Sequence, residues 1–233
     1  LLDNTQREDL KTMNEKLSSL SLKFNQNTLK ETNNFKLLIN HSSDLDGLPD
    51  DLIELGKKQA EAEDIENGWL FKASRENLYP FLTFSKNRNL REKIYKGYVL
   101  RGKNKNSENN EHHIKEMFTL RKQKAKLLGF DCHADLALQN SMAETTTNVI
   151  DLLDQVWKPA KKRANQEISE MQTLIQKEGN NFELEPWDWW FYSEKVRKEK
   201  YDFSEEDMRP FLSLENIRDC LLYTSPSPRD SGK

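Results

Sequence analysis

The chain has 233 residues, of which 32% are charged and 35% are hydrophobic, and it contains only eight Gly. This composition is typical of a helix-rich protein that forms one large domain or two small ones. The formal net charge of −3 argues against a nucleic-acid-binding protein, and no apolar run approaches the roughly 20 residues of a membrane helix.

The first predicted element is a long helix over residues 9–33. Its apolar residues are spaced alternately by three and four positions, which is the pattern of one helical face. We expect this helix to pack antiparallel to another one through the stripe formed by Leu10, Met13, Leu17, Leu20 and Phe24.

Two short apolar runs, at residues 35–40 and 68–73, are predicted to be strands. If they pair, they form a two-stranded ribbon, which is barely stable alone and must be covered by helices. Between them, the acids that follow Pro49 predict the first turn of a helix that runs to about Glu63.

The middle of the chain predicts further helices separated by polar turns. Residues 74–82 are interpreted as a capped turn that Pro80 complicates, and Ser85 is expected to cap a helix that ends near Arg101. Residues 102–110 are the clearest loop, because they are polar and rich in Asn.

Three helices are predicted beyond this loop. The first covers residues 112–128 and ends at Gly129, and a short one covers residues 133–138. The third covers residues 145–177, with Pro159 expected to kink it. Its apolar residues form two stripes, the first of Val149, Leu152, Leu153, Val156 and Ala160 and the second of Ile168, Met171, Leu174 and Ile175.

The most informative stretch is residues 181–219, which holds three of the five Trp within four positions: Trp187, Trp189 and Trp190. Each aromatic side chain buries about 150–250 Å² when it packs. Pro186 suits the first position of a helix, and Ser204 with Asp207 predicts the cap of another, which Arg209-Pro210 should end. The Trp cluster is interpreted either as a core helix or as the wall of a binding cleft.

The segment ELEPWDWWFYSEKVRKEKYDFSEEDMRPFLSLENIRD resembles the region that precedes the catalytic core in thimet-oligopeptidase-type zinc metallopeptidases. The shared features are a Trp-Asp-Trp, a Tyr-x-Glu-Lys-x-Arg and an Arg-Pro-Phe-x-x-Leu-Glu. The double Trp, together with residues 152–160, resembles the peptidyl-dipeptidase Dcp branch more than the oligopeptidase A branch. The similarity extends from about Leu10 to Asp219.

The resemblance implies an all-α fold of long antiparallel helices with a minor two-stranded β-ribbon, as part of a larger metallopeptidase. Residues 1–219 would be its N-terminal helical domain, incomplete at its C-terminal end. Residues 220–233, CLLYTSPSPRDSGK, break the preceding pattern and resemble a translated sequencing adaptor, so we interpret them as a non-native tail.

No catalytic or metal-binding residue is predicted in this chain, and no substrate-binding residue can be named. A zinc peptidase of this type needs His-Glu-x-x-His, and none of the four His has a His four positions away. His112 and Glu116 are one turn apart and could hold a metal weakly. Two such residues on an exposed helix are more often part of a solvated surface. Cys132 and His133 are adjacent, so on a helix their side chains point in different directions.

The resemblance therefore implies a zinc enzyme whose metal ligands are not present in this chain. The full-length protein is expected to be a monomer that cleaves short unfolded peptides and releases C-terminal dipeptides, without nucleic-acid or membrane partners. An oligopeptidase A-like endopeptidase fragment and a stand-alone helical interaction module are the alternatives. Cys132 suits the cytoplasm, and the periplasm is the other compartment considered.

Overall fold

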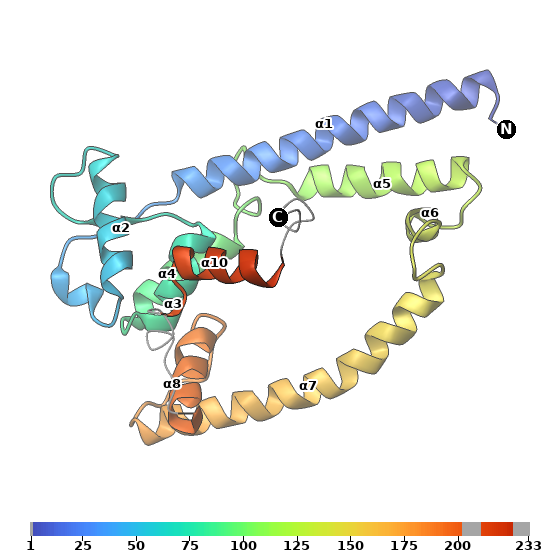
Figure 1. The fold of residues 1–233 in the computed structure, drawn as a ribbon. Helices are drawn as coiled ribbons and strands as arrows, with labels where there is room; N and C mark the ends of the chain where they lie inside the picture. Colours follow the sequence, from blue (N-terminus) through green and yellow to red (C-terminus); the bar gives the residue numbers. More distant parts are fainter. Residues whose placement is uncertain (1, 202–210, 226–233) are drawn as a thin grey trace, which may run out of the picture.

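A computed structural model of the chain describes residues 2–201 and 211–225, and its architecture is dominated by long helices (Figure 1). α1 (Asn4–Asn34) and α5 (Glu111–Leu127) lie side by side and form one edge of the molecule. The opposite edge is α7 (Thr146–Lys177), which α6 (His133–Leu138) joins to α5. A globular part lies at the end where α7 finishes. The predicted helical fold class is therefore confirmed.

The pair α1 and α5 runs antiparallel, as the apolar stripe of α1 predicts. Asn27 donates a hydrogen bond to Asn110 near one end of the pair, and Lys124 donates one to Asn14 near the other. α1 begins five residues earlier than expected. The reason is a capping box in which Asp3 and Gln6 each bind the backbone N–H of the other.

The predicted ribbon is present and is antiparallel. β1 (Leu37–Ile39) pairs with β2 (Trp69–Phe71), with Leu38 opposite Leu70. The short η1 (Ser42–Leu45) and α2 (Asp50–Glu61) connect the strands, and α2 packs on β2. Gly56 makes this packing possible, because a Cβ there would lie 2.6 Å from the Phe71 ring.

The prediction of a turn at residues 74–82 is wrong, because these residues belong to the helix α3 (Arg75–Phe84). Ser74 caps this helix by accepting a hydrogen bond from the Asn77 N–H. Pro80 costs about 3 kcal/mol inside a helix. Each fully buried large apolar side chain contributes about 1.5–3 kcal/mol, so the burial of Leu78, Phe81 and Leu82 outweighs that cost.

The prediction that Ser85 caps the following helix is also wrong. Ser85 is the C-terminal cap of α3 and is buried. The next helix, α4 (Arg88–Val99), is capped by Asn87, whose side-chain oxygen accepts the Leu90 N–H at 3.2 Å. The loop at 102–110 is confirmed, and buried Glu31 on α1 anchors it by accepting hydrogen bonds from Gly102, Asn104 and Asn106.

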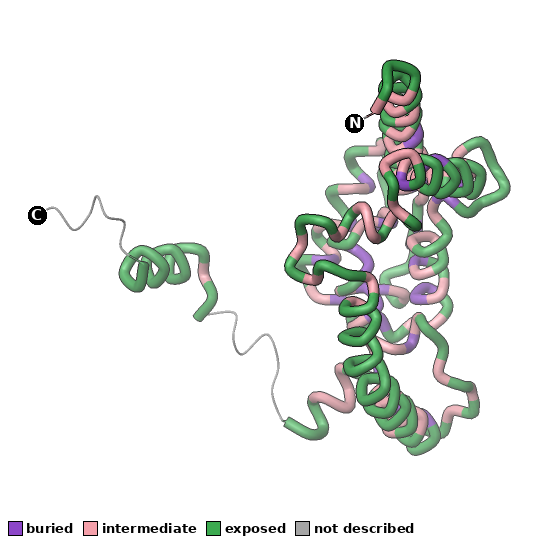
Figure 2. Tube along the Cα trace, turned by 90° about the vertical axis from the view of Figure 1, so that its right-hand side faces the viewer, coloured by how far each residue is buried: buried purple, intermediate pink, exposed green. Residues whose placement is uncertain are grey.

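α7 follows the predicted boundaries, and its two apolar stripes differ in burial. The helix continues through Pro159 and is bowed along its length (Figure 1). The second stripe is packed, with Met171 and Ile175 buried. The first stripe is not, since every residue from 151 to 163 is exposed, including Leu152 at 62% and Val156 at 57% (Figure 2). The first stripe therefore forms an exposed apolar face of α7.

α8 (Trp189–Tyr201) returns from the end of α7 and packs on both α3 and α7. It starts three residues after Pro186, because residues 186–188 form a turn instead of the first helical positions. The predicted cap at Ser204 and the stop at Arg209-Pro210 lie outside the described residues. α10 (Leu214–Thr224) is exposed along its length and runs across position 220, where the non-native tail is predicted to begin.

Among residues 2–201 and 211–225, no helix combines the length and the hydrophobicity needed to cross a lipid bilayer.

Candidate functional site

The Trp cluster lies where α8 and the turn before it pack against α3, α4 and α7. Trp187 and Trp190 pack against the larger apolar core, which contains the ribbon, α3 and α4. Trp189 and Phe191 pack instead against the smaller core formed by Met171, Ile175 and Tyr192. The cluster therefore joins the two cores of the described chain.

Two aromatic pairs tie α8 and its preceding turn to earlier helices. The rings of Tyr95 and Trp187 are edge-to-face, with centroids 6.2 Å apart. Those of Tyr79 and Trp190 are tilted, with centroids 5.6 Å apart. Such pairs contribute about 0.5–1.5 kcal/mol beyond their buried area, so they hold the Trp residues in fixed positions.

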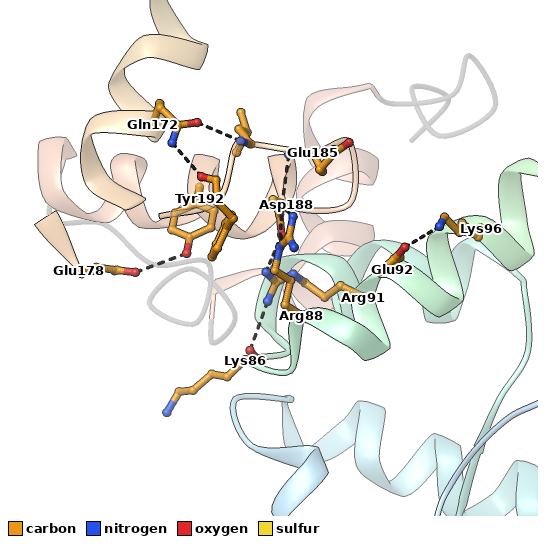
Figure 3. Close-up of polar contacts among 12 residues, drawn as sticks. Lys86, Arg88, Arg91, Glu92, Lys96, Gln172, Glu178, Glu185, Asp188 and Tyr192 are labelled. Carbon is orange, nitrogen blue, oxygen red and sulfur yellow. Dashed lines mark hydrogen bonds and ion pairs between the residues drawn. The ribbon is translucent and has the colours of Figure 1, made fainter. Parts of the chain in front are cut away.

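A buried carboxylate, Asp188, stands at the start of α8 between two guanidinium groups of α4 (Figure 3). Arg88 donates to it from Nε and Nη2, and Arg91 donates from Nη2 at 2.8 Å. Asp188 also accepts the Glu185 N–H at 3.2 Å. A buried charge is tolerated only when it is paired in this way, so Asp188 fixes both the turn at 185–188 and its docking on α4.

The segment before this turn is hydrogen-bonded to α7 through the side chain of Gln172 (Figure 3). Its Nε2 donates to the carbonyl of Phe182 at 2.9 Å, and its Oε1 accepts the Leu184 N–H at 2.9 Å. A residue in a neighbouring β-strand would form the same two hydrogen bonds, because its main chain also offers one donor and one acceptor. Residues 182–184 are therefore held like a strand along α7.

Two hollows adjoin this segment. The first is largely apolar and has a volume of about 440 Å³; the residues that line it are Tyr95, Ile168, Leu184, Glu185, Pro186, Trp189 and Trp190. The second is polar and has a volume of about 480 Å³, and it shares Ile168 and Leu184 with the first. Both volumes are in the usual range of ligand pockets, roughly 300–1,000 Å³. The Trp cluster therefore packs in the core, and two of its members, Trp189 and Trp190, also line the apolar hollow. Both interpretations of the sequence, a core helix and a cleft wall, thus apply.

The histidines do not form a metal centre in the described part of the chain. The rings of His112 and His113 are tilted by 44° with centroids 3.7 Å apart, and the Nδ1 of His113 is buried without a hydrogen-bond partner among the described residues. Burial, with His112 and Lys23 close by, lowers the pKa of His113. Among the described residues, no three His, Cys, Asp or Glu side chains gather as a metal would require.

The structure also does not bring Cys132 and His133 together as a thiol–base pair. The Cys132 Sγ donates to the carboxylate of Asp135 at 3.1 Å. His133 instead lies near Arg121 and Lys124 of α5, and burial lowers its pKa. Sequence reasoning missed Asp188 and Gln172, although an acid enclosed by three Trp is a signal of a buried ion pair.

Comparison with known sequences then identifies the family of the chain. The profile of peptidase family M3 matches residues 81–225, and the chain belongs to this family. It is 34% identical to oligopeptidase A of Haemophilus influenzae over 201 residues, which are 84% of this chain and 29% of that relative. It is 28% identical to dipeptidyl carboxypeptidase of Escherichia coli, over 93% of this chain and 32% of that relative.

A plant relative extends the comparison. The chain is 31% identical to the probable cytosolic oligopeptidase A of Arabidopsis thaliana, over 95% of this chain and 32% of that relative. The chain therefore spans less than a third of the length of the relatives named here. Both branches considered from the sequence, oligopeptidase A and the dipeptide-releasing enzymes, are represented among them.

Proposed function

We propose that this chain is the N-terminal, non-catalytic portion of a zinc metallopeptidase that hydrolyses short peptides and releases C-terminal dipeptides. The observation that carries the proposal is membership of peptidase family M3 over most of the chain. The relative named dipeptidyl carboxypeptidase supports the dipeptide-releasing mode. Endopeptidase action, as in an oligopeptidase A, is the second candidate because relatives of that name match stretches of similar length.

The described residues do not fit a zinc centre, so no step of hydrolysis is assigned to them. The sequence lacks His-Glu-x-x-His, and no set of three potential ligands is found in residues 2–201 and 211–225. The proposed contribution of this chain is a rigid wall for a peptide-binding channel. The fixed Trp cluster and the two hollows beside it support that role.

The exposed stretch of α7 also supports a role as one part of a larger protein. Leu152, Leu153, Val156 and Trp157 are each more than half exposed. An apolar surface of this kind usually marks an interface. We propose that it is covered by the remainder of the enzyme. The alternative, a stand-alone interaction module, would instead bind a partner helix through the Trp187–Phe191 face, and it would be well behaved as a free monomer.

The proposed domain division and compartment follow from the same account. Residues 1–219 form the peptidase portion and residues 220–233 a non-native tail, and the parent enzyme is a cytoplasmic monomer. One relative is named as cytosolic, while a periplasmic location is the alternative. The test is to read the gene beyond codon 219 and to assay the encoded protein: the proposal requires a His-Glu-x-x-His and peptide hydrolysis, and it fails without them.

A further inference from the structure

We propose that residues 182–186, with the two hollows beside them, bind an extended peptide that carries basic side chains next to an apolar one. The peptide would lie along this segment as an added strand and place its apolar side chain against Trp189 and Trp190. This inference deepens the proposed function and rests on it only in the choice of a peptide as ligand.

The first argument is the unpaired main chain of Glu183. In an extended segment, successive residues direct their N–H and C=O groups to opposite sides. Gln172 binds the carbonyl of Phe182 and the N–H of Leu184, which lie on the same side of the segment. The N–H and C=O of Glu183 therefore point away from Gln172. They bind no residue within the described part of the chain. Unpaired main-chain groups on an exposed segment can accept a peptide by strand addition, as the edge of a sheet does.

The second argument is the position of the hollows along this edge. Glu183 lines the polar hollow and Glu185 lines the apolar one, while Leu184 lines both. A peptide that pairs with Glu183 therefore has an apolar recess on one side and a polar recess on the other. Main-chain pairing supplies affinity in this mode of recognition, and the recesses select the side chains.

The third argument is charge. The carboxylates of Glu183 and Glu185 are exposed, and neither is in an ion pair with a residue that the structure describes. No Lys, Arg or His lines either hollow. Arg88 stacks on the Phe182 ring at 4.1 Å, but its charge is already matched by Asp188. The site is thus negative and favours a positively charged ligand.

The test uses the 233-residue chain and its own Trp fluorescence, since Trp189 and Trp190 line the recess. The probe is an acetylated, amidated Lys-Leu-Lys-Leu-Lys peptide, and the matched control is Glu-Leu-Glu-Leu-Glu. We expect saturable binding of the Lys peptide, weakened about tenfold or more in the Glu peptide because two attractive pairs become repulsive. Equal affinity for both peptides, or no saturable binding of the Lys peptide, would overturn the proposal.

Two further arms separate strand addition from simple charge attraction. N-methylation of the central Lys of the probe removes one main-chain donor and should weaken binding by about tenfold. This arm leaves the protein unchanged, so it does not depend on the folding of a variant. The double substitution Glu183→Lys and Glu185→Lys alters exposed side chains only, and it should reverse the preference between the peptides. Either arm without effect would overturn the inference, and neither depends on hydrolysis.

Discussion

The carboxylate of Asp188 and the guanidinium of Arg91 form a buried ion pair at 2.8 Å, across 97 positions of sequence. Both side chains are almost fully buried, with 0% and 2% of their surfaces exposed. The contact joins α4 to the start of α8, so the position of the Trp cluster depends on it.

Asp188→Asn should therefore destabilise the chain strongly. The substitution leaves the buried charge of Arg91 without a counterion, which costs about 3–5 kcal/mol. Unfolding in urea, followed by circular dichroism, measures the loss. The matched control is Asp46→Asn, which removes an exposed pair with Lys86 and should cost about 1 kcal/mol or less. Similar losses in the two variants would show that the Asp188 pair has no special role.

Gln172→Leu should release residues 182–184 from α7. Two hydrogen bonds are lost, at about 0.5–1.5 kcal/mol each. The control is Gln176→Leu on the same helix, since Gln176 lines the same polar hollow but its side chain binds none of the described residues. Urea unfolding together with hydrogen exchange of the Leu184 amide measures the effect. Unchanged exchange in Gln172→Leu would contradict the assigned role.

Glu63 should make the ribbon region sensitive to acid. Its carboxylate binds Lys36 and Lys72, and these contacts lower the pKa of Glu63 to about 2. A carboxyl group whose pKa is lower in the folded than in the unfolded state stabilises the fold above the unfolded value. This contribution is therefore present above pH 4.5 and is lost as the pH falls from there towards 2.

The variant Glu63→Gln should lack this part of the acid dependence while it retains the rest. The free energy of unfolding, measured from pH 6 down to about 2, gives the comparison. Glu66→Gln is the control, because Glu66 is exposed nearby and takes part in no ion pair with a described residue. If the two variants lose stability along the same pH profile, the ion pairs of Glu63 do not contribute.

The sequence predicts most of the described helices, because apolar spacing depends on local geometry alone. The boundaries of α6 and α7 and the pairing of the two strands follow from this local pattern. α3 could not be predicted, because the cost of Pro80 is visible in the sequence while the burial of Leu78, Phe81 and Leu82 is not. The exposure of the first stripe of α7 could not be predicted for the same reason. The spacing of apolar residues defines one face of a helix, but it does not show which part of the protein covers that face.

The candidate site was predicted only in part for a related reason. Three neighbouring Trp indicate a packed or ligand-binding surface whatever the fold is. Asp188 and Gln172 depend on contacts with distant residues, namely Arg88 and Arg91 for the first and the main chain of residues 182 and 184 for the second. No local pattern in a single sequence encodes such partners.

The most direct test of the account is zinc-dependent hydrolysis of a blocked oligopeptide, measured side by side for this chain and for the protein encoded by the continued gene. We expect no turnover by the 233-residue chain with added zinc, and release of C-terminal dipeptides by the longer protein. Zinc-dependent hydrolysis by this chain alone, or none by the longer protein, would contradict the account.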